Sequence, residues 1–328
     1  MSTISDHLAA FHGLPVFDHT AAATEDSATA KLPAAADAAW RIGLDYESEI
    51  TFEEAWQAFL DSVDTTQVRA VVIGNWWGDN YGPLTDALAA IVASAGQLPA
   101  LRALFIGDVV SEECELSWLQ MTDVTPVLES FPQLEELVVR GASGGYGDDE
   151  PPLSLRPLRH ERLRALRFEA GGLPGSVVRA VTACEFPALE RLELWLGVEE
   201  YGGDATVADL APLLAGAGLP ALRHLGLENS ELQDEIAAAV AGAPVVARLE
   251  RLSLAMGTLT DEGATALLEG QPLTHLSALD LHHHFLTDPM IERLRTALEP
   301  AGVAVDLSEQ EKPDEYDGET WRYTANAE

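Results

Sequence analysis

The sequence predicts an α/β fold in which short parallel strands and helices alternate along the chain, with a curved sheet inside and helices outside. Two observations predict this fold. A frame of the form apolar-x-x-apolar-x-apolar returns seven times, at intervals of 33, 29, 26, 33, 27 and 27 residues. The segments between the copies are long enough, and apolar enough at the right spacing, to form helices of two to four turns.

Each copy of the frame is expected to form one short strand. The first residues of the seven clear copies are Leu101, Leu134, Leu163, Leu189, Leu222, Leu249 and Leu276, and weaker copies lie at Val68 and around Val305. Because side chains alternate along a strand, the fourth and sixth positions point into the core and the third, fifth and seventh face out. One such strand cannot bury its apolar face alone, so the copies must stack into a parallel sheet.

The segments before, between and after the strands set the predicted boundaries. Helices are expected at 51–64, 83–95, 122–131, 174–186, 206–217, 232–241, 261–269 and 288–298. A strand at 40–46 and a capping box from Thr51 to Glu54 predict an N-terminal cap over 38–64, within a repeat region of 38–308. Residues 1–37 form a head and a mobile linker. Residues 309–328 form an acidic tail that is either mobile or folded back through Trp321 and Tyr323.

The repeat frame resembles that of the leucine-rich repeat proteins, and its helical returns are similar to those of the ribonuclease-inhibitor-like type. The steps Leu259-Thr260-Asp261 and Leu286-Thr287-Asp288 after two strands support this subtype. The head, residues 4–18, also resembles the start of a bacterial leucine-rich repeat family to which no activity is attached. The resemblance covers residues 65–308 and implies a solenoid. It departs from the family at the ninth position, where Asn is replaced by Trp76, Val109, Ala142, Gly171, Gly197, Ser230, Gly257 and His284.

The charge of the chain is strongly negative. Lys and Arg number 19 and Asp and Glu 54, so the formal charge is 19 − 54 = −35. This charge disfavours nucleic acid and anionic membranes and favours a basic protein partner. An acidic mimic of nucleic acid would satisfy the same argument. Two cysteines, no signal-like N-terminus and no membrane-length apolar run predict a reduced, cytoplasmic protein.

Outward positions on neighbouring strands carry opposite charges. The second position reads Arg69, Arg102, Glu135, Arg164, Glu190, Arg223, Glu250 and Ser277. At the fifth position, Arg167 faces Glu193 on the next strand. Adjacent parallel strands lie about 4.8 Å apart, so such residues are expected to pair and to fix the register.

Three loops at the strand ends combine aromatic and acidic residues, and they predict a binding rim beside the concave face. A bacterial protein-interaction module is the function that this rim favours, because aromatic anchors surrounded by carboxylates suit a basic segment of a partner. The alternative is that Trp76 or Trp77 only covers the core edge. The candidate partner-binding residues are Trp76, Trp77, Tyr81, Tyr146, Asp148, Asp149, Trp195, Glu199, Glu200, Tyr201, Asp204 and Glu228.

The run His282-His283-His284 is the one metal-like feature of the sequence. His282 and His284 point to one side of an extended strand end, with Asp280 on the same face, so they are weak candidate ligands for zinc or nickel. Ordinary surface histidines are the alternative. A metal-dependent enzyme or accessory protein centred on these residues is the competing function. No nucleophile, phosphate-loop or dinucleotide motif follows a strand, so no catalytic residue, cofactor or small-molecule substrate is predicted.

Overall fold

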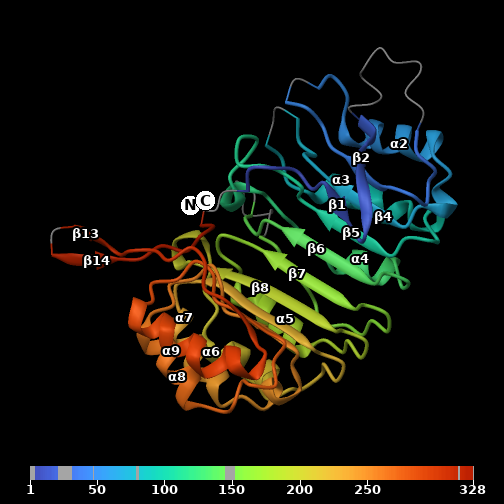
Figure 1. The fold of residues 1–328 in the computed structure, drawn as a ribbon. Coiled ribbons are helices and arrows are strands. Elements are labelled where there is room, and N and C mark those ends of the chain that lie inside the picture. The colour runs from blue at the N-terminus through green and yellow to red at the C-terminus, as the bar shows by residue number, and fades with distance from the viewer. Residues whose placement is uncertain are drawn as a thin grey trace. The chain divides into compact units, whose positions relative to one another are not determined.

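The computed structural model describes residues 4–20, 32–46, 48–78, 81–144, 152–316 and 318–327. They form two compact units. The N-terminal unit comprises Ile4–Arg156 and His160–Leu166, and the C-terminal unit comprises Pro157–Arg159 and Arg167–Glu328. Each unit is an α/β structure whose strands are mostly parallel and hydrogen-bonded in chain order (Figure 1). The head of residues 4–18 thus belongs to the N-terminal unit, and the acidic C-terminal segment belongs to the C-terminal unit.

The N-terminal unit contains six strands and three described α-helices. The strands are β1 (Ala10–Phe11), β2 (Leu14–Asp18), β3 (Ala39–Ile42), β4 (Ala70–Ile73), β5 (Ala103–Ile106) and β6 (Glu136–Arg140). The helices are α2 (Phe52–Ser62), α3 (Thr85–Ala93) and α4 (Thr125–Ser130). The predicted capping box opens α2, where Thr51 and Glu54 each accept a hydrogen bond from the other's backbone N–H. Apolar residues spaced three and four apart then turn one face of α2 into the core, as expected of an amphipathic helix.

Both faces of the sheet in the N-terminal unit are apolar. Val71, Ile73, Leu104 and Ile106 face the helices, while Ala39, Ala70, Val72, Ala103, Phe105 and Val138 form a second buried cluster. Phe11 covers this second cluster, with Leu8, Leu14 and Val16 packed around it. The rings of Phe11 and Phe105 meet edge to face at 5.7 Å. The outward positions predicted to face solvent are therefore buried here, because the head folds over them.

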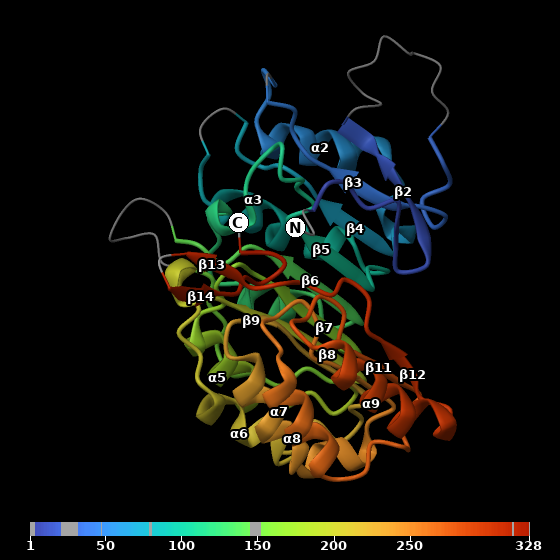
Figure 2. The same ribbon diagram turned by 60° about the vertical axis from the view of Figure 1, so that its left-hand side comes forward.

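The C-terminal unit repeats strand and helix in strict alternation. Its strands are β7 (Ala165–Glu169, within which the division between the units falls), β8 (Arg191–Gly197), β9 (His224–Ser230), β10 (Arg251–Ser253), β11 (Ala278–Asp280) and β12 (Ala304–Asp306). Its helices are α5 (Gly175–Ala183), α6 (Val207–Leu214), α7 (Gln233–Ala241), α8 (Asp261–Glu269) and α9 (Asp288–Leu298). Successive helices lie side by side along one face of the strands (Figures 1 and 2).

Register in the C-terminal unit places equivalent repeat positions beside one another. Leu192 pairs with Leu225, Leu225 with Leu252, and Leu252 with Leu279. These fourth-position leucines are buried against the helices, as the frame predicts. The third, fifth and seventh positions face the opposite side, which we call the open face.

In each of the last four copies of the frame, the eighth position has a left-handed backbone conformation. Asn229, Met256, His283 and Glu309 occupy the eighth position of their copies and have φ values of 54, 64, 54 and 57°. A non-glycine residue rarely adopts this conformation without compensating contacts. The turns of these four copies are therefore alike, although the ninth-position Asn of the resembled family is missing. The earlier turns vary, since positive φ falls at the seventh position in Gly107 and at the ninth in Gly197.

The C-terminal segment is ordered against its own unit, unlike the mobile tail that its composition predicts. Residues Asp314–Tyr316 and Glu319–Trp321 form the antiparallel hairpin β13–β14, which projects from the unit in Figure 1. Thr324, Ala325 and Asn326 are then buried. Trp321 and Tyr323 are 47% and 58% exposed, so they do not provide the predicted cover over the last repeat.

Asn229 holds this segment in place. Its side chain accepts a hydrogen bond from Asn326 N over 3.0 Å and donates one to Asn326 O over 2.6 Å. Ala325 N donates to Met256 O over 2.8 Å. The Asn229 amide thus pairs with the backbone of Asn326 through one donor and one acceptor, as a neighbouring strand would. Amino-acid composition alone cannot predict such a contact.

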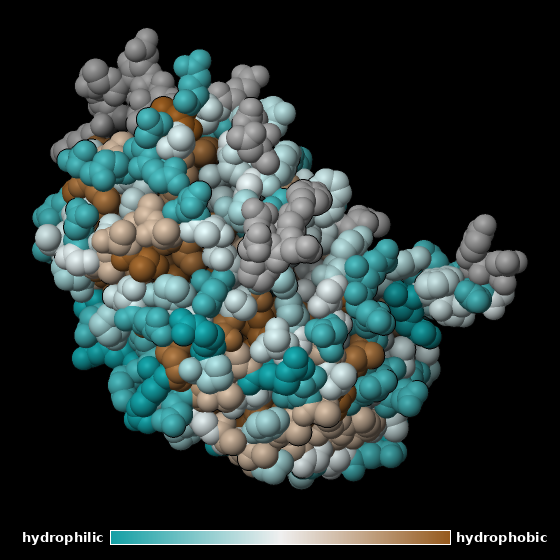
Figure 3. All heavy atoms as spheres, turned by 180° about the vertical axis from the view of Figure 1, so that it is seen from behind, coloured by the Kyte–Doolittle hydropathy of each residue, from teal (hydrophilic) through white to brown (hydrophobic). Residues whose placement is uncertain are grey.

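The described helices include none that is both long and apolar enough to span a membrane. On the face shown in Figure 3, hydrophilic residues predominate and hydrophobic residues form separate patches.

Candidate functional site

The open face of the C-terminal unit carries a cavity of about 680 Å³ over strands β8 to β12. Five acidic residues line it, whereas its cationic side chains are Arg251 and, when protonated, His224. We call this cavity the acidic groove, with Glu193, Glu228, Asp280, Glu299 and Asp306 as its acidic residues. Parallel pairing sets the fifth positions of consecutive strands in one row, in the order Glu193, Gly226, Ser253, Asp280 and Asp306.

Glu193 lies between a cationic and an imidazole side chain at one end of this row. Arg167 Nε lies 2.6 Å from Glu193 Oε2, and Arg167 Nη1 lies 2.9 Å from Glu169 Oε1. The sequence predicted the Arg167–Glu193 pair, and the structure confirms it. On its other side, Glu193 Oε1 lies 3.3 Å from His224 Nε2. Burial lowers the pKa of His224, so this imidazole is mainly neutral at neutral pH.

Glu228 is the most perturbed carboxyl of the groove. Burial, reinforced by the nearby Glu193 charge, raises the pKa of Glu228 to about 7. Trp195 Nε1 donates a hydrogen bond to Glu228 Oε2 over 3.0 Å. The hydroxyl of Ser253 lies close enough to lower this pKa slightly, but it makes no hydrogen bond of standard geometry.

Gly226 leaves the space that the two glutamates occupy. A Cβ atom at this position would lie 2.8 Å from Glu228 Oε1 and 3.0 Å from Glu193 Cγ. Any larger residue at this fifth position would therefore push the carboxyls away from the groove wall. Glycine at position 226 therefore allows the carboxyls of Glu193 and Glu228 to line the groove.

Asp280, His282 and Asp306 gather at the other end of the row. One ligand-type atom from each residue lies within 4.8 Å of the others. Asp280 Oδ1 accepts from His282 Nδ1 over 2.8 Å, and this bond raises the pKa of His282. Ser308 donates to Asp306 Oδ1 from its backbone N and its hydroxyl, which lowers the pKa of Asp306.

His284, the second predicted metal ligand, does not belong to this cluster. Its side chain is fully buried, with Nε2 3.2 Å from Leu307 O and Nδ1 accepting from Leu286 N over 3.1 Å. Burial lowers its pKa, so it is a neutral structural residue that satisfies two backbone groups. The chain turns at His283, whose φ is positive, so the alternation expected of an extended strand end does not hold.

The predicted rim residues of the N-terminal unit range from buried to exposed. Trp76 is 5% exposed and donates Nε1–H to Gly82 O over 3.0 Å, so it covers the core edge. Trp77 meets Trp76 edge to face at 4.8 Å and stacks on Tyr81 at 5.8 Å. Tyr81 is exposed. Tyr146, Asp148 and Asp149 lie outside the described residues.

The rim residues of the C-terminal unit have different surroundings. Glu199 and Glu200 are exposed in a 3₁₀ turn that ends at Tyr201. Asp204 Oδ1 accepts a hydrogen bond from Gly175 N, the first residue of α5, over 2.6 Å, so Asp204 supports that helix start. Trp195 is half-buried and packs on Ala255, Met256 and Ala325. Glu228 is the one rim prediction that lines the acidic groove.

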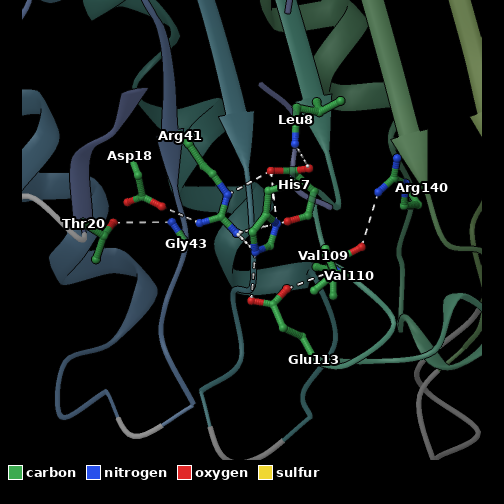
Figure 4. A network of polar contacts seen from close by, with 11 residues as sticks. His7, Leu8, Asp18, Thr20, Arg41, Gly43, Val109, Val110, Glu113 and Arg140 are labelled. Carbon is green, nitrogen blue, oxygen red and sulfur yellow. Dashed lines mark hydrogen bonds and ion pairs between the residues drawn. The ribbon is translucent and has the colours of Figure 1, made fainter. Parts of the chain in front are cut away.

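A second polar network lies in the N-terminal unit and fastens the head (Figure 4). Arg41 binds Asp108 through Nε at 2.9 Å and Asp18 through Nη1 at 2.6 Å. Asp108 is 0% exposed and also accepts from Leu8 N over 3.1 Å. His7 lies between Asp108 and Glu113 at 3.5 and 3.4 Å. The contacts tie residues 7, 8 and 18 to strand ends, so we assign the network a structural role.

The two cysteines of the described residues are not suited to react as thiolates, because burial raises the pKa of both. Cys114 and Cys184 are both buried thiols, as predicted. Burial raises the pKa of Cys114 to about 11, which keeps it protonated.

Comparison with known proteins gives a structural likeness. No family model matches the chain, and no curated protein matches it. Among solved structures, a crystal structure of a protein from Bacteroides fragilis is 28% identical, covers 87% of this chain and 76% of its own, and superposes with a TM-score of 0.76. The likeness supports the long sheet of mostly parallel strands.

Proposed function

We propose that this chain is a leucine-rich repeat protein of the ribonuclease-inhibitor-like type, and that it binds a basic segment of a partner protein without catalysis. The repeat frame, the chain-order parallel strands and the likeness to the Bacteroides fragilis structure support the repeat type. The acidic groove is the binding surface of this proposal.

One observation carries the proposal: the two open faces differ in what covers them. In the N-terminal unit the head buries an apolar open face. In the C-terminal unit the open face presents a 680 Å³ cavity lined by five acidic residues. A groove of this kind attracts cationic side chains, and partially neutral Glu228 can ionise when a cation arrives. This binding surface differs from the aromatic rim expected from the loops.

The test uses a labelled lysine- and arginine-rich peptide, measured by fluorescence anisotropy in EDTA at low and moderate salt. The groove variant combines Glu228→Gln, Asp280→Asn and Asp306→Asn. The matched control combines Glu235→Gln, Glu262→Gln and Glu292→Gln, three exposed helix positions. We expect the groove variant to bind at least about ten-fold more weakly, with a flatter salt dependence, and the control to change little. Equal loss in both variants would show that only net charge matters and would refute the groove.

A further inference from the structure

We propose that Asp280, His282 and Asp306 form a binding site for a divalent transition-metal cation at the β11–β12 end of the acidic groove. The three residues offer ligand atoms within 4.8 Å of one another. Register brings them together, because Asp280 and Asp306 are partners in the parallel pair β11–β12 and His282 follows Asp280 by two residues. The site replaces the predicted set, with Asp306 in the place of His284.

The donor set determines the class of cation. Two carboxylates and one imidazole suit Zn²⁺, Mn²⁺ or Fe²⁺, whereas Ca²⁺ and Mg²⁺ prefer oxygen ligands alone. Neither aspartate lies in an ion pair with Lys or Arg among the described residues. The bonds to Asp280 come from His282, and those to Asp306 come from Ser308 and reach Oδ1 only. Three protein ligands leave further positions on the cation for water or a bound group.

Ser253 gives an independent indication of a missing ligand. It lies in register with Asp280 on the neighbouring strand and lines the same cavity. The residue is 3% exposed, and its Oγ lies near the Glu228 carboxyl but makes no hydrogen bond of standard geometry in the described part of the chain. A buried hydroxyl without a hydrogen-bond partner is unfavourable, so such groups are usually satisfied by a ligand or an ordered water. Water held on a cation beside Asp280 would supply this partner.

The proposal does not depend on a protein partner, and its test contains none. The full-length chain is stripped with EDTA, exchanged into buffer and titrated calorimetrically with ZnCl₂, MnCl₂ and CaCl₂ in turn. We expect one equivalent of Zn²⁺ or Mn²⁺ per chain and at least about ten-fold weaker binding of Ca²⁺. Asp306→Asn and His282→Gln should each weaken the binding by about ten-fold or more. Asp314→Asn and His275→Gln are the controls, because they remove the same groups elsewhere in this unit.

Circular dichroism checks that each variant is folded. An NMR spectrum correlating imidazole protons and nitrogens provides the second readout, in which the His282 signals should shift with the first equivalent of Zn²⁺. Binding that Asp306→Asn and His282→Gln leave unchanged, or no stoichiometric binding at all, would overturn the site. Peptide binding is measured in EDTA, so failure of the metal site and failure of the proposed function are distinguishable.

Discussion

The indole of Trp195 donates its Nε1–H to Oε2 of Glu228 over 3.0 Å, and the two residues are direct partners in the register of β8 and β9. Both occupy the seventh position of the repeat frame. The bond ties the one half-buried tryptophan of the C-terminal open face to a carboxyl whose pKa is raised to about 7. The charge of the groove therefore changes in the physiological pH range.

The free energy of unfolding of Glu228→Gln, taken relative to the parent, should be larger at pH 8 than at pH 5. The folded-state pKa of about 7 lies above the ordinary value of 4.5. As pH rises from 4.5 to 7, the unfolded chain ionises this group and the folded chain does not, so the parent loses stability, on the order of 3 kcal/mol in full. The variant has no such group to titrate. Urea unfolding at pH 5, 6, 7 and 8 measures the difference.

The matched control for this prediction is Glu200→Gln, an exposed carboxyl in the same unit. Its stability should follow the parent at every pH. A constant offset between Glu228→Gln and the parent would show that the pKa of Glu228 is not raised.

Asp108→Asn should loosen the head of the N-terminal unit. Asn keeps an oxygen for Leu8 N but removes the charge facing the buried Arg41, and breaking such a pair costs about 3 kcal/mol. Hydrogen exchange of residues 4–18 should accelerate, and urea unfolding should report the loss. Asp18→Asn is the control, because Asp18 is one-third exposed and its loss should cost less than about 1 kcal/mol. Equal effects of the two variants would contradict the structural role of Asp108.

The strands and helices were predictable because each repeat has its own periodic signal. The eight helices expected from 51–64 to 288–298 correspond to α2 to α9. The register was equally accessible, since laying the copies side by side pairs Arg167 with Glu193. Asp306 could have been found in the same way, as the fifth position of the weak last copy.

The covering of the open faces was not predictable from the repeat frame. The sequence does hold one signal of it: Val72, Phe105 and Val138 are apolar at outward positions, which indicates that something covers the N-terminal open face. The docking of the C-terminal segment left no such signal. It depends on bonds between the Asn229 side chain and backbone groups 97 residues away, which neither periodicity nor composition encodes.

Leu225→Asp should unfold the C-terminal repeats. Leu225 is a fourth-position residue with no exposed surface, so aspartate there would bury an unpaired carboxylate at a cost of about 4 kcal/mol or more. Arg223→Ala, two residues earlier and exposed, should cost about 0.5 kcal/mol or less. Thermal unfolding followed by circular dichroism separates them. Parallel melting of both variants with the parent would show that the register is wrong.

Asn229→Gly should release the C-terminal segment while leaving the sheet folded. Glycine accepts the positive φ of 54° without strain, so the change removes the side-chain amide, its hydrogen bonds to Asn326 N and O, and a longer one from Nδ2 to Ala170 O over 3.3 Å. Asn326→Ala is the matched control, since those two bonds involve the backbone of Asn326 and survive the substitution. We expect faster proteolysis after residue 318 and a change in Trp195 fluorescence, because Ala325 packs on that indole, in the Asn229 variant alone. If Asn326→Ala frees the segment equally, then side-chain burial of Asn326, and not the amide of Asn229, holds the C-terminus.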